Sequence, residues 1–527
     1  MRVENVDILK DIIKSIKQLF CQMDAFNYDK IEVLIKAIEH ISYLERLFMN
    51  SMFVYDVNAC ERFRMRIKIL VEGILRGLTT ATEGSGTPKQ DSVEELVAIA
   101  FVYNEIFYLL RHLITHGDLD GVEYNYDSKT LKIGIPNEQS KYLEALNYLS
   151  LKMDEKNKTN EFLKESVCLC DLHSNTNKRI QAFYEDKEVI AISQLPNEII
   201  CGLQMIIKPY QIYEKCYFII EDKMNLNGFY TYGNFKSVAY TLFMYSIVLR
   251  SLKGNNWFVH RTELVDLIND IYNLLEIEKE VIETIIDDMI FKFDNEDHID
   301  FQPLIIGEIG EALLIPLYIE DRLCNKWYID ISKSLYVDCF NEAQNALTSL
   351  FESAVEDVLK EKLKTSNVQA FKIKNITQID RVASFPEDST IILVQIKHQT
   401  TFSNQHIRKG ISQLEGSARA VKNHWEHFSR KLKGWHGKSE PKNIIKLLVT
   451  NWFRGTLDNI PGDIWILNID ELKKLECDDV DDFLRMMMSY NKRIRQDDII
   501  FTFEERTLFD YTFIDETVAL KTLDAYR

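Results

Sequence analysis

The stretch that decides the fold of the C-terminal third is Ile391–Gln399, which reads IILVQIKHQ. Its first four residues are apolar and mostly β-branched, as is typical of a buried β-strand. Side chains two positions apart on a strand point to the same face, so Gln395 and Lys397 share one face while Val394 and Ile396 point into the core. A glutamine and a lysine on one face of a strand that begins with four apolar residues are unusual for packing alone, and they indicate a functional site.

The segments around this strand predict a layered α/β unit. A helical pattern precedes it, one strand with polar alternation carries Asp380, and Pro386–Ser389 (PEDS) forms a turn. A helix, a buried strand and a strand that feeds a helix follow. The predicted elements are a helix over 341–364, a strand over 368–385, a strand over 391–399, a helix over 408–433, a strand over 443–452 and a strand with a helix over 463–475. This order predicts an α/β sandwich around a small mixed sheet, in which Asp380 reaches Gln395 and Lys397 if their strands pair.

These residues resemble a known family. Residues 349–400 are similar to the PD-(D/E)xK nuclease superfamily, particularly to its Mrr-like restriction endonuclease branch. The matching motif is a Phe-Glu pair on the preceding helix (Phe351 and Glu352), then Asp380, then Gln395-Ile396-Lys397. The resemblance implies a restriction-endonuclease-like domain over residues 341–480 that hydrolyses phosphodiesters with Mg²⁺ or Mn²⁺.

The resemblance also implies a role for each motif residue. Asp380 would bind the metal directly, Glu352 would add a ligand through water, and Lys397 would position and polarise the attacking water. Gln395 completes the catalytic set. The predicted metal-binding positions are Asp380, Glu352 and Ile396.

Two residues complicate this assignment. Gln395 stands where an acid is more common, although Mrr-like members share the glutamine, and a neutral ligand would weaken the affinity for the metal. Glu356 lies one turn after Glu352 on the same helical face. Because Glu352 matches the family's Phe-Glu pair, we expect Glu356 to be a solvated helix residue.

The charge distribution predicts where nucleic acid would bind. The formal net charge is −18, which argues against nucleic-acid binding by the whole surface. Residues 397–446, however, contain eleven Lys/Arg and three acids, which gives this segment a net charge of +8 and leaves −26 on the rest of the chain. Such a patch suits phosphate binding, although a solvated helix face is the alternative. The predicted nucleic-acid-binding residues are Lys409, Gln413, Arg419, Lys422, Lys431 and Lys433. Gln413 is included because related nucleases place a polar residue there.

Aromatic side chains within the same basic segment have two interpretations. Trp425, His427, Trp435 and His436 are suited to stacking on bases or sugars. They are equally suited to packing in the domain core.

A second candidate site lies near the end of a long helical pattern at 93–114. Arg111 and His116 resemble the R-x4-6-H motif of HEPN ribonucleases, which cut RNA without a metal and whose sites need two protomers. In that chemistry the histidine acts as general base or acid and the arginine stabilises phosphate charge. The alternative is a helix C-terminus whose basic residues complement its dipole and which Gly117 ends.

The whole sequence predicts a multidomain α+β protein with a mostly helical N-terminal half. The predicted regions are a helical domain at 1–155, a mixed α/β region at 156–340, the nuclease-like domain at 341–480 and a C-terminal tail at 481–527. In the mixed region, short apolar runs at 188–193 and 216–221 predict strands, and 302–319 predicts a hairpin that turns at Gly307–Gly310.

The expected activity is metal-dependent cleavage of DNA, with RNA as the less favoured substrate, in prokaryotic restriction or anti-phage defence. The alternatives are a binding protein with a degenerate nuclease fold and a HEPN-type ribonuclease. A homo-oligomer or a partner protein of a defence system is also expected. No apolar run approaches the roughly 20 residues that span a bilayer, and the N-terminus is amphipathic and unlike a signal peptide. These features predict a cytoplasmic protein without a membrane partner.

Overall fold

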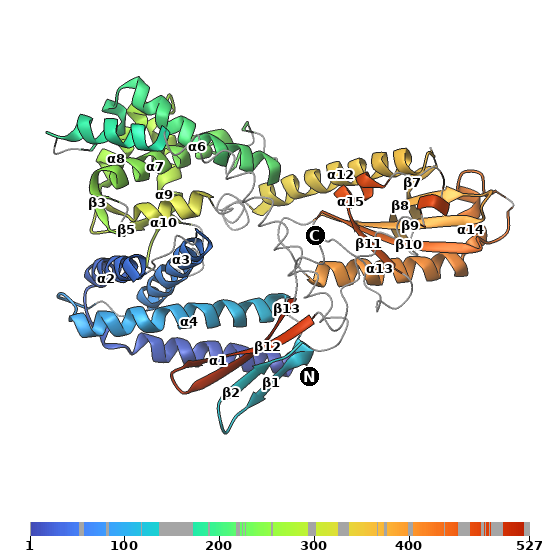
Figure 1. Ribbon diagram of the computed structural model, residues 1–527, viewed down its shortest axis with the longest axis horizontal. Helices are drawn as coiled ribbons and strands as arrows, with labels where there is room; N and C mark the ends of the chain where they lie inside the picture. Colours follow the sequence, from blue (N-terminus) through green and yellow to red (C-terminus); the bar gives the residue numbers. More distant parts are fainter. Residues whose placement is uncertain are drawn as a thin grey trace.

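The chain folds into three lobes of mixed α and β structure (Figure 1). In this computed structural model, the described residues form three mixed sheets of four, five and four strands. None of the described helices combines the length and apolar character that a membrane crossing requires. The structure describes residues 2–520 except 52–56, 81–83, 117–118, 136–171, 188–189, 218–221, 224, 227, 255–256, 294–301, 325–336, 366, 374–376, 399–403, 437, 452–463, 476–478, 480, 484 and 486–498.

Amphipathic helices build the N-terminal lobe, as their 3.6-residue periodicity predicts. Their apolar stripes meet in one core that includes Phe20, Leu75 and Tyr103. A hairpin follows the last helix, and its turn is stabilised because Asn125 Oδ1 accepts the backbone N–H groups of Asp127 and Ser128. The elements are α1 (Arg2–Cys21), η1 (Asp24–Asn27), α2 (Lys30–Ser51), α3 (Val57–Thr80), α4 (Gln90–His116), η2 (Leu119–Gly121), β1 (Val122–Asn125) and β2 (Thr130–Ile133).

The C-terminal tail completes the sheet of this N-terminal lobe. Strands β12 (Ile499–Leu508) and β13 (Tyr511–Leu520) form a hairpin, and β13 pairs in parallel with β2, giving the order β1-β2-β13-β12. The apolar side chains of Leu508, Tyr511 and Phe513 are buried in the N-terminal core. The two ends of the sequence therefore belong to one folded unit.

We predict that Phe513→Ala will destabilise this N-terminal unit by about 3–5 kcal/mol, since it leaves a cavity in a closed core. Phe513 is 1% exposed. Hydrogen exchange of the β1, β2 and β13 amides should show the loss of protection. Phe503→Ala is the matched control, because Phe503 is 69% exposed on the same hairpin. Equal effects of the two substitutions would contradict the packing described here.

The middle lobe contains a helix-turn-helix unit. Helices α8 (Leu264–Leu274) and α9 (Lys279–Met289) are joined by a turn of four residues, and the predicted hairpin follows at β5 and β6. Strand β6 also pairs with β3, so the hairpin forms a wing beside the two helices. The remaining elements are a helix over 172–184, η3 (Ile192–Gln194), α6 (Asn197–Tyr217), α7 (Tyr232–Lys253), β3 (His260–Glu263), β4 (Ile290–Phe291), β5 (Leu304–Ile306), β6 (Glu311–Leu314) and α10 (Pro316–Cys324).

This helix-turn-helix unit is strongly acidic. Residues 264–289 contain eight Asp or Glu and one lysine, a net of −7. On α9, the exposed positions include Glu280, Glu283 and Asp287. This surface would repel phosphate groups, and it is therefore an unfavourable place for nucleic acid to bind.

The C-terminal lobe is a mixed sheet between helices, as the sequence predicts, and the sheet has five strands where the sequence predicts four. The strand order is β11-β10-β9-β8-β7, with β7, β8 and β9 antiparallel and β9, β10 and β11 parallel. In Figure 1, α12 covers one face of the sheet and α13 the other. The elements are α12 (Val337–Lys362), β7 (Val368–Ile373), β8 (Thr377–Phe385), β9 (Thr390–Lys397), α13 (Asn404–Asn423), α14 (Trp425–Lys431), β10 (Asn443–Thr450), β11 (Ile464–Asn468) and α15 (Ile469–Lys474).

The alternation of β9 divides the core of this lobe into two layers. Ile392, Val394 and Ile396 pack with α12 and α15. Ile391 and Leu393 pack with α13 and α14. Gln395 and Lys397 continue the second series, as the spacing of two predicts.

Three predictions about local structure were wrong. The single strand predicted at 368–385 is two strands, β7 and β8, which pair antiparallel. No glycine or proline stands between them to mark the reversal in the sequence. The helix predicted at 408–433 ends at Asn423, and α14 begins at Trp425. The described part of the run at 188–193 contains the start of a 3₁₀ helix at Ile192–Gln194, because short apolar runs fit helix and strand equally well. Of the strand predicted at 216–221, residues 218–221 lie outside the described residues, and α6 ends at Tyr217.

Candidate functional site

The site lies where β8 and β9 separate. Their antiparallel ladder stops at the pair Arg381–Val394, and β8 continues beside β7 alone, with Ile379 opposite Phe371. In the register shift, two residues of β8 (Asp380 and Arg381) oppose one residue of β7. Such a bulge bends a strand and redirects its side chains.

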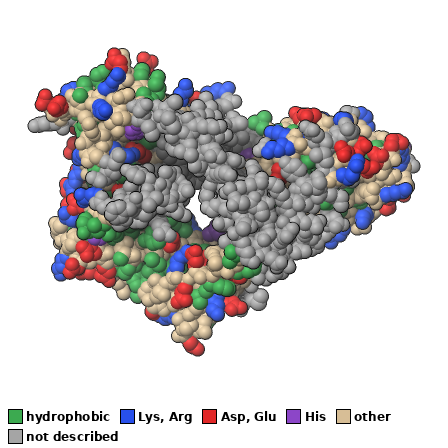
Figure 2. Space-filling model, in the orientation of Figure 1, with side chains coloured by type: hydrophobic (Ala, Val, Ile, Leu, Met, Phe, Trp, Pro, Cys, Tyr) green, Lys and Arg blue, Asp and Glu red, His purple; other side chains and the backbone are tan. Residues whose placement is uncertain are grey.

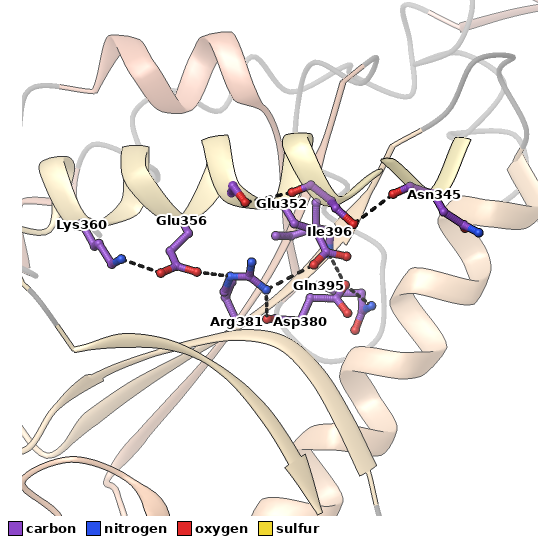
Figure 3. Close-up of polar contacts among 10 residues, drawn as sticks. Asn345, Glu352, Glu356, Lys360, Asp380, Arg381, Gln395 and Ile396 are labelled. Carbon is purple, nitrogen blue, oxygen red and sulfur yellow. Dashed lines mark hydrogen bonds and ion pairs between the residues drawn. The ribbon is translucent and has the colours of Figure 1, made fainter. Parts of the chain in front are cut away.

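Asp380 fills the gap between the separated strands. Its Oδ2 accepts the backbone N–H of Ile396 at 2.8 Å and also accepts a hydrogen bond from Gln395 Nε2 (Figure 3). A side-chain carboxylate thus replaces the backbone acceptor that a continuous ladder would supply. This contact confirms that Asp380 reaches Gln395, as the sequence predicts if their strands pair.

Gln395 brings an unsatisfied oxygen to the site. The side chain is 3% exposed. Its Nε2 donates to Asp380, while its Oε1 is buried without a hydrogen-bond partner among the described residues. A buried carbonyl oxygen without a donor is energetically unfavourable, and a cation or a ligand donor would satisfy it.

The side chain of Lys397 packs against α13. A Cβ atom built on Gly410 of α13 would lie 3.3 Å from both Cγ and Cε of Lys397 and 2.9 Å from Leu448 Cδ1. Glycine inside a helix costs about 1 kcal/mol relative to alanine. At position 410 it leaves the space that the lysine stem occupies.

The Phe-Glu pair of α12 borders the same site. The Phe351 ring lies 5.2 Å from the ring of His398, measured between centroids. His398 directly follows Lys397 in the chain. Glu352 turns instead toward β8, where its Oε2 lies 3.3 Å from Arg381 Nη1. The structure therefore brings the predicted residues Glu352, Asp380, Gln395 and Lys397 together.

The expectation for Glu356 was wrong. Its Oε2 lies 2.6 Å from Arg381 Nε, and its Oε1 accepts from Lys360, so the side chain is half-buried in an ion-pair chain (Figure 3). Arg381 itself was missed. The available signal was a pair of glutamates one turn apart on a helix face that packs on a sheet, because two acids so placed require a buried cation.

Burial disfavours the charged forms of three site residues. Desolvation raises the pKa of Asp380. Desolvation and then the charge of Asp380 raise the pKa of Glu352. Desolvation lowers the pKa of Lys397 despite the nearby acids. For Glu356 burial is outweighed by Lys360 and Arg381, which together lower its pKa. A cation between Asp380 and Glu352 would stabilise both carboxylates.

The donor set suits a hard divalent cation. It offers the carboxylates of Asp380 and Glu352 and the orphaned carboxamide oxygen of Gln395, and oxygen is the ligand atom that Mg²⁺ prefers. Ile396 has a buried apolar side chain, so only its backbone carbonyl could contribute. No group of three His, Cys, Asp or Glu residues placed to hold a metal occurs in the described part of the chain. With only two carboxylates, the site is expected to bind the cation weakly.

The predicted nucleic-acid-binding side chains are all exposed and lie on α13, at the end of α14 or just after it: Lys409, Gln413, Arg419, Lys422, Lys431 and Lys433. Lys409 is near enough to Lys397 to lower its pKa by charge repulsion, a smaller contribution than burial. Figure 2 shows Lys/Arg and Asp/Glu side chains interspersed over the visible face of this lobe, without a field of one sign.

The aromatic residues of the basic segment divide into two groups. Trp425 and Trp435 are buried and pack edge to face, with ring centroids 5.1 Å apart. His427 and His436 are exposed. The core interpretation is therefore correct for the two tryptophans.

The second candidate site is described in part. Helix α4 ends at His116, and Arg111 is exposed one turn earlier. The side chain of His116 lies outside the described residues. The helix end agrees with the alternative of a helix C-terminus, and the ribonuclease hypothesis stays a prediction.

Comparisons of this chain with protein-family models, with curated proteins and with solved structures found no match.

Proposed function

We propose that this chain is a metal-dependent endonuclease that hydrolyses phosphodiester bonds of DNA. The observation that carries the proposal is the convergence of four residues where β8 and β9 separate. Glu352 and Lys397 are close enough to Asp380 for the charges to influence one another, and Gln395 Oε1 has no hydrogen-bond partner among the described residues. The sheet between α12 and α13 supports a restriction-endonuclease-like fold for this lobe. The sequence resemblance suggests a role in prokaryotic restriction or anti-phage defence.

Each side chain has a role that its position supports. Asp380, Glu352, Gln395 Oε1 and the Ile396 carbonyl would hold Mg²⁺ or Mn²⁺, which would supply Lewis acidity at the scissile phosphate. The ammonium group of Lys397 would orient the attacking water and neutralise charge that develops on the phosphate oxygens. Exposed cations of α13, beginning with Lys409 beside Lys397, would contact the flanking backbone phosphates.

The proposal is tested by incubating the full chain with supercoiled plasmid DNA and with structured RNA, each with Mg²⁺, with Mn²⁺ and with EDTA. Metal-dependent cutting of DNA, faster than that of RNA, is the expected result. RNA cutting that persists in EDTA and disappears in His116→Ala would overturn the proposal in favour of Arg111 and His116. DNA binding without cutting under every condition would replace it with a nucleic-acid-binding function.

Gly410→Ala is expected to slow cleavage by roughly tenfold. The new methyl group would push the Lys397 stem by a few tenths of an ångström or more, and misplacing a catalytic group by about 1 Å costs about a hundredfold. Single-turnover rates at saturating metal measure the effect. Gly416→Ala is the matched control on the same helix, because a Cβ there meets nothing within 4 Å. A Gly410→Ala rate equal to that of Gly416→Ala would show that Lys397 does not depend on this space.

A further inference from the structure

Arg381 is a buried arginine that joins helix α12 to the bulge of β8. It is 9% exposed. Its Nη1 donates to the backbone oxygen of Asp380 at 2.6 Å and to Glu352 Oε2 at 3.3 Å. Its Nε lies 2.6 Å from Glu356 Oε2 (Figure 3). One planar guanidinium group thus contacts three oxygen atoms from two elements.

The contacts of Arg381 differ in strength. The short contacts to Glu356 and to the Asp380 carbonyl hold the guanidinium against both α12 and the bulge. Glu356 is held in turn by Lys360. The contact to Glu352 is the longest of the three. Glu352 is therefore the partner that can most readily leave Arg381 to bind a cation.

The cluster is balanced in charge, because Glu352 and Glu356 lie beside two cations, Arg381 and Lys360. Charge balance alone does not fix the directions of the carboxylates, and burying ion pairs costs desolvation energy. The fork of an arginine does, however, fix the directions of two acceptors at once, which a point charge cannot do. Glu356 therefore anchors the guanidinium group, and the guanidinium group orients Glu352.

We propose that Arg381 is the positioning residue of the cation site: it locks the bulge that presents Asp380 and orients Glu352 from α12 toward the same cation. This inference rests on the proposed function. Asp380 and Arg381, the two residues of the bulge, have complementary roles in this proposal. Asp380 would bind the cation, and Arg381 holds the backbone that carries Asp380. Groups that orient ligands in this way typically contribute 10–100-fold to metal affinity.

The test measures Mn²⁺ binding to the full chain by calorimetry, without nucleic acid, together with the Mn²⁺ dependence of DNA cleavage. Arg381→Gln is expected to weaken Mn²⁺ binding by about 10–100-fold and to raise the Mn²⁺ concentration for half-maximal cleavage equally. The rate at saturating Mn²⁺ should change less than the affinity. Arg381→Lys keeps the charge without the fork and should recover only part of the affinity.

Glu356→Gln removes the charge of the ion pair but keeps an oxygen atom beside Arg381 Nε, so it should weaken Mn²⁺ binding less than Glu356→Ala does. Arg250→Gln is the matched control, because Arg250 is also largely buried in an ion pair, with Glu320, in the middle lobe. Its Mn²⁺ affinity should not change.

Unchanged Mn²⁺ affinity in a folded Arg381→Gln variant would overturn the positioning role while leaving the proposed function intact. Equal losses in Arg381→Gln and Arg250→Gln would also overturn it, since a general loss of stability would explain both. If wild type neither binds Mn²⁺ nor cuts DNA, the proposed function fails together with this inference.

Discussion

Replacing Lys397 by methionine is expected to reduce metal-dependent cleavage by at least about a hundredfold, the usual cost of removing one group that stabilises transition-state charge. Methionine preserves the stem that packs beside Gly410, so the fold should be retained. The loss should appear in the single-turnover rate at saturating DNA and metal and not in DNA affinity.

The pH dependence of wild type gives a second readout for Lys397. Burial lowers the pKa of this lysine. If it acts in its charged form, the rate should fall as the pH rises through that lowered pKa, before the ordinary range of a lysine is reached. Lys409→Met is the matched control: this exposed neighbour should weaken DNA binding with little effect on the rate. A Lys397→Met variant that cuts at the wild-type rate would remove the lysine from the mechanism.

Asp380→Asn is expected to reduce cleavage by roughly two to three orders of magnitude and yet to stabilise the metal-free protein. Burial raises the pKa of Asp380 in the folded state. The stability that this group contributes is present below the unfolded carboxyl pKa and is lost as the pH rises through the folded value. Near neutral pH its ionised form therefore opposes folding, while a neutral asparagine can still accept the Ile396 N–H.

Thermal unfolding in EDTA should accordingly show a higher Tm for Asp380→Asn than for wild type at neutral pH, with the difference shrinking below the carboxyl pKa. Added Mn²⁺ should raise the Tm of wild type and leave that of the variant unchanged. Mn²⁺ stabilisation that survives in Asp380→Asn would show that the cation binds elsewhere. A lower Tm of the variant in EDTA would show that the ionised carboxylate of Asp380 stabilises the folded state and does not oppose folding.

The spacing of Glu352 and Glu356 indicates a buried cation, but the sequence identifies neither that cation as Arg381 nor the point at which β8 separates from β9. Residues 368–385 contain no glycine or proline, and their apolar residues recur at uneven intervals, so the pattern does not reveal where one strand becomes two or where a bulge adds a residue. The ion pairs of Arg381 depend on which turn of α12 meets the bulge. Burial of Gln395 Oε1 without a partner likewise depends on neighbours from several elements.

The sequence by itself determined the helices of the N-terminal lobe, the strand that carries Gln395 and Lys397, and the shared face of those two residues. These features follow from local periods of 3.6 and 2, which any window of the chain displays. Only the tertiary structure decided that residues 499–520 complete a sheet begun at residue 122, and that β3 pairs with β6 of the later hairpin. Pairing between distant segments depends on complementary surfaces formed after local structure, and it leaves no period in the sequence of either partner.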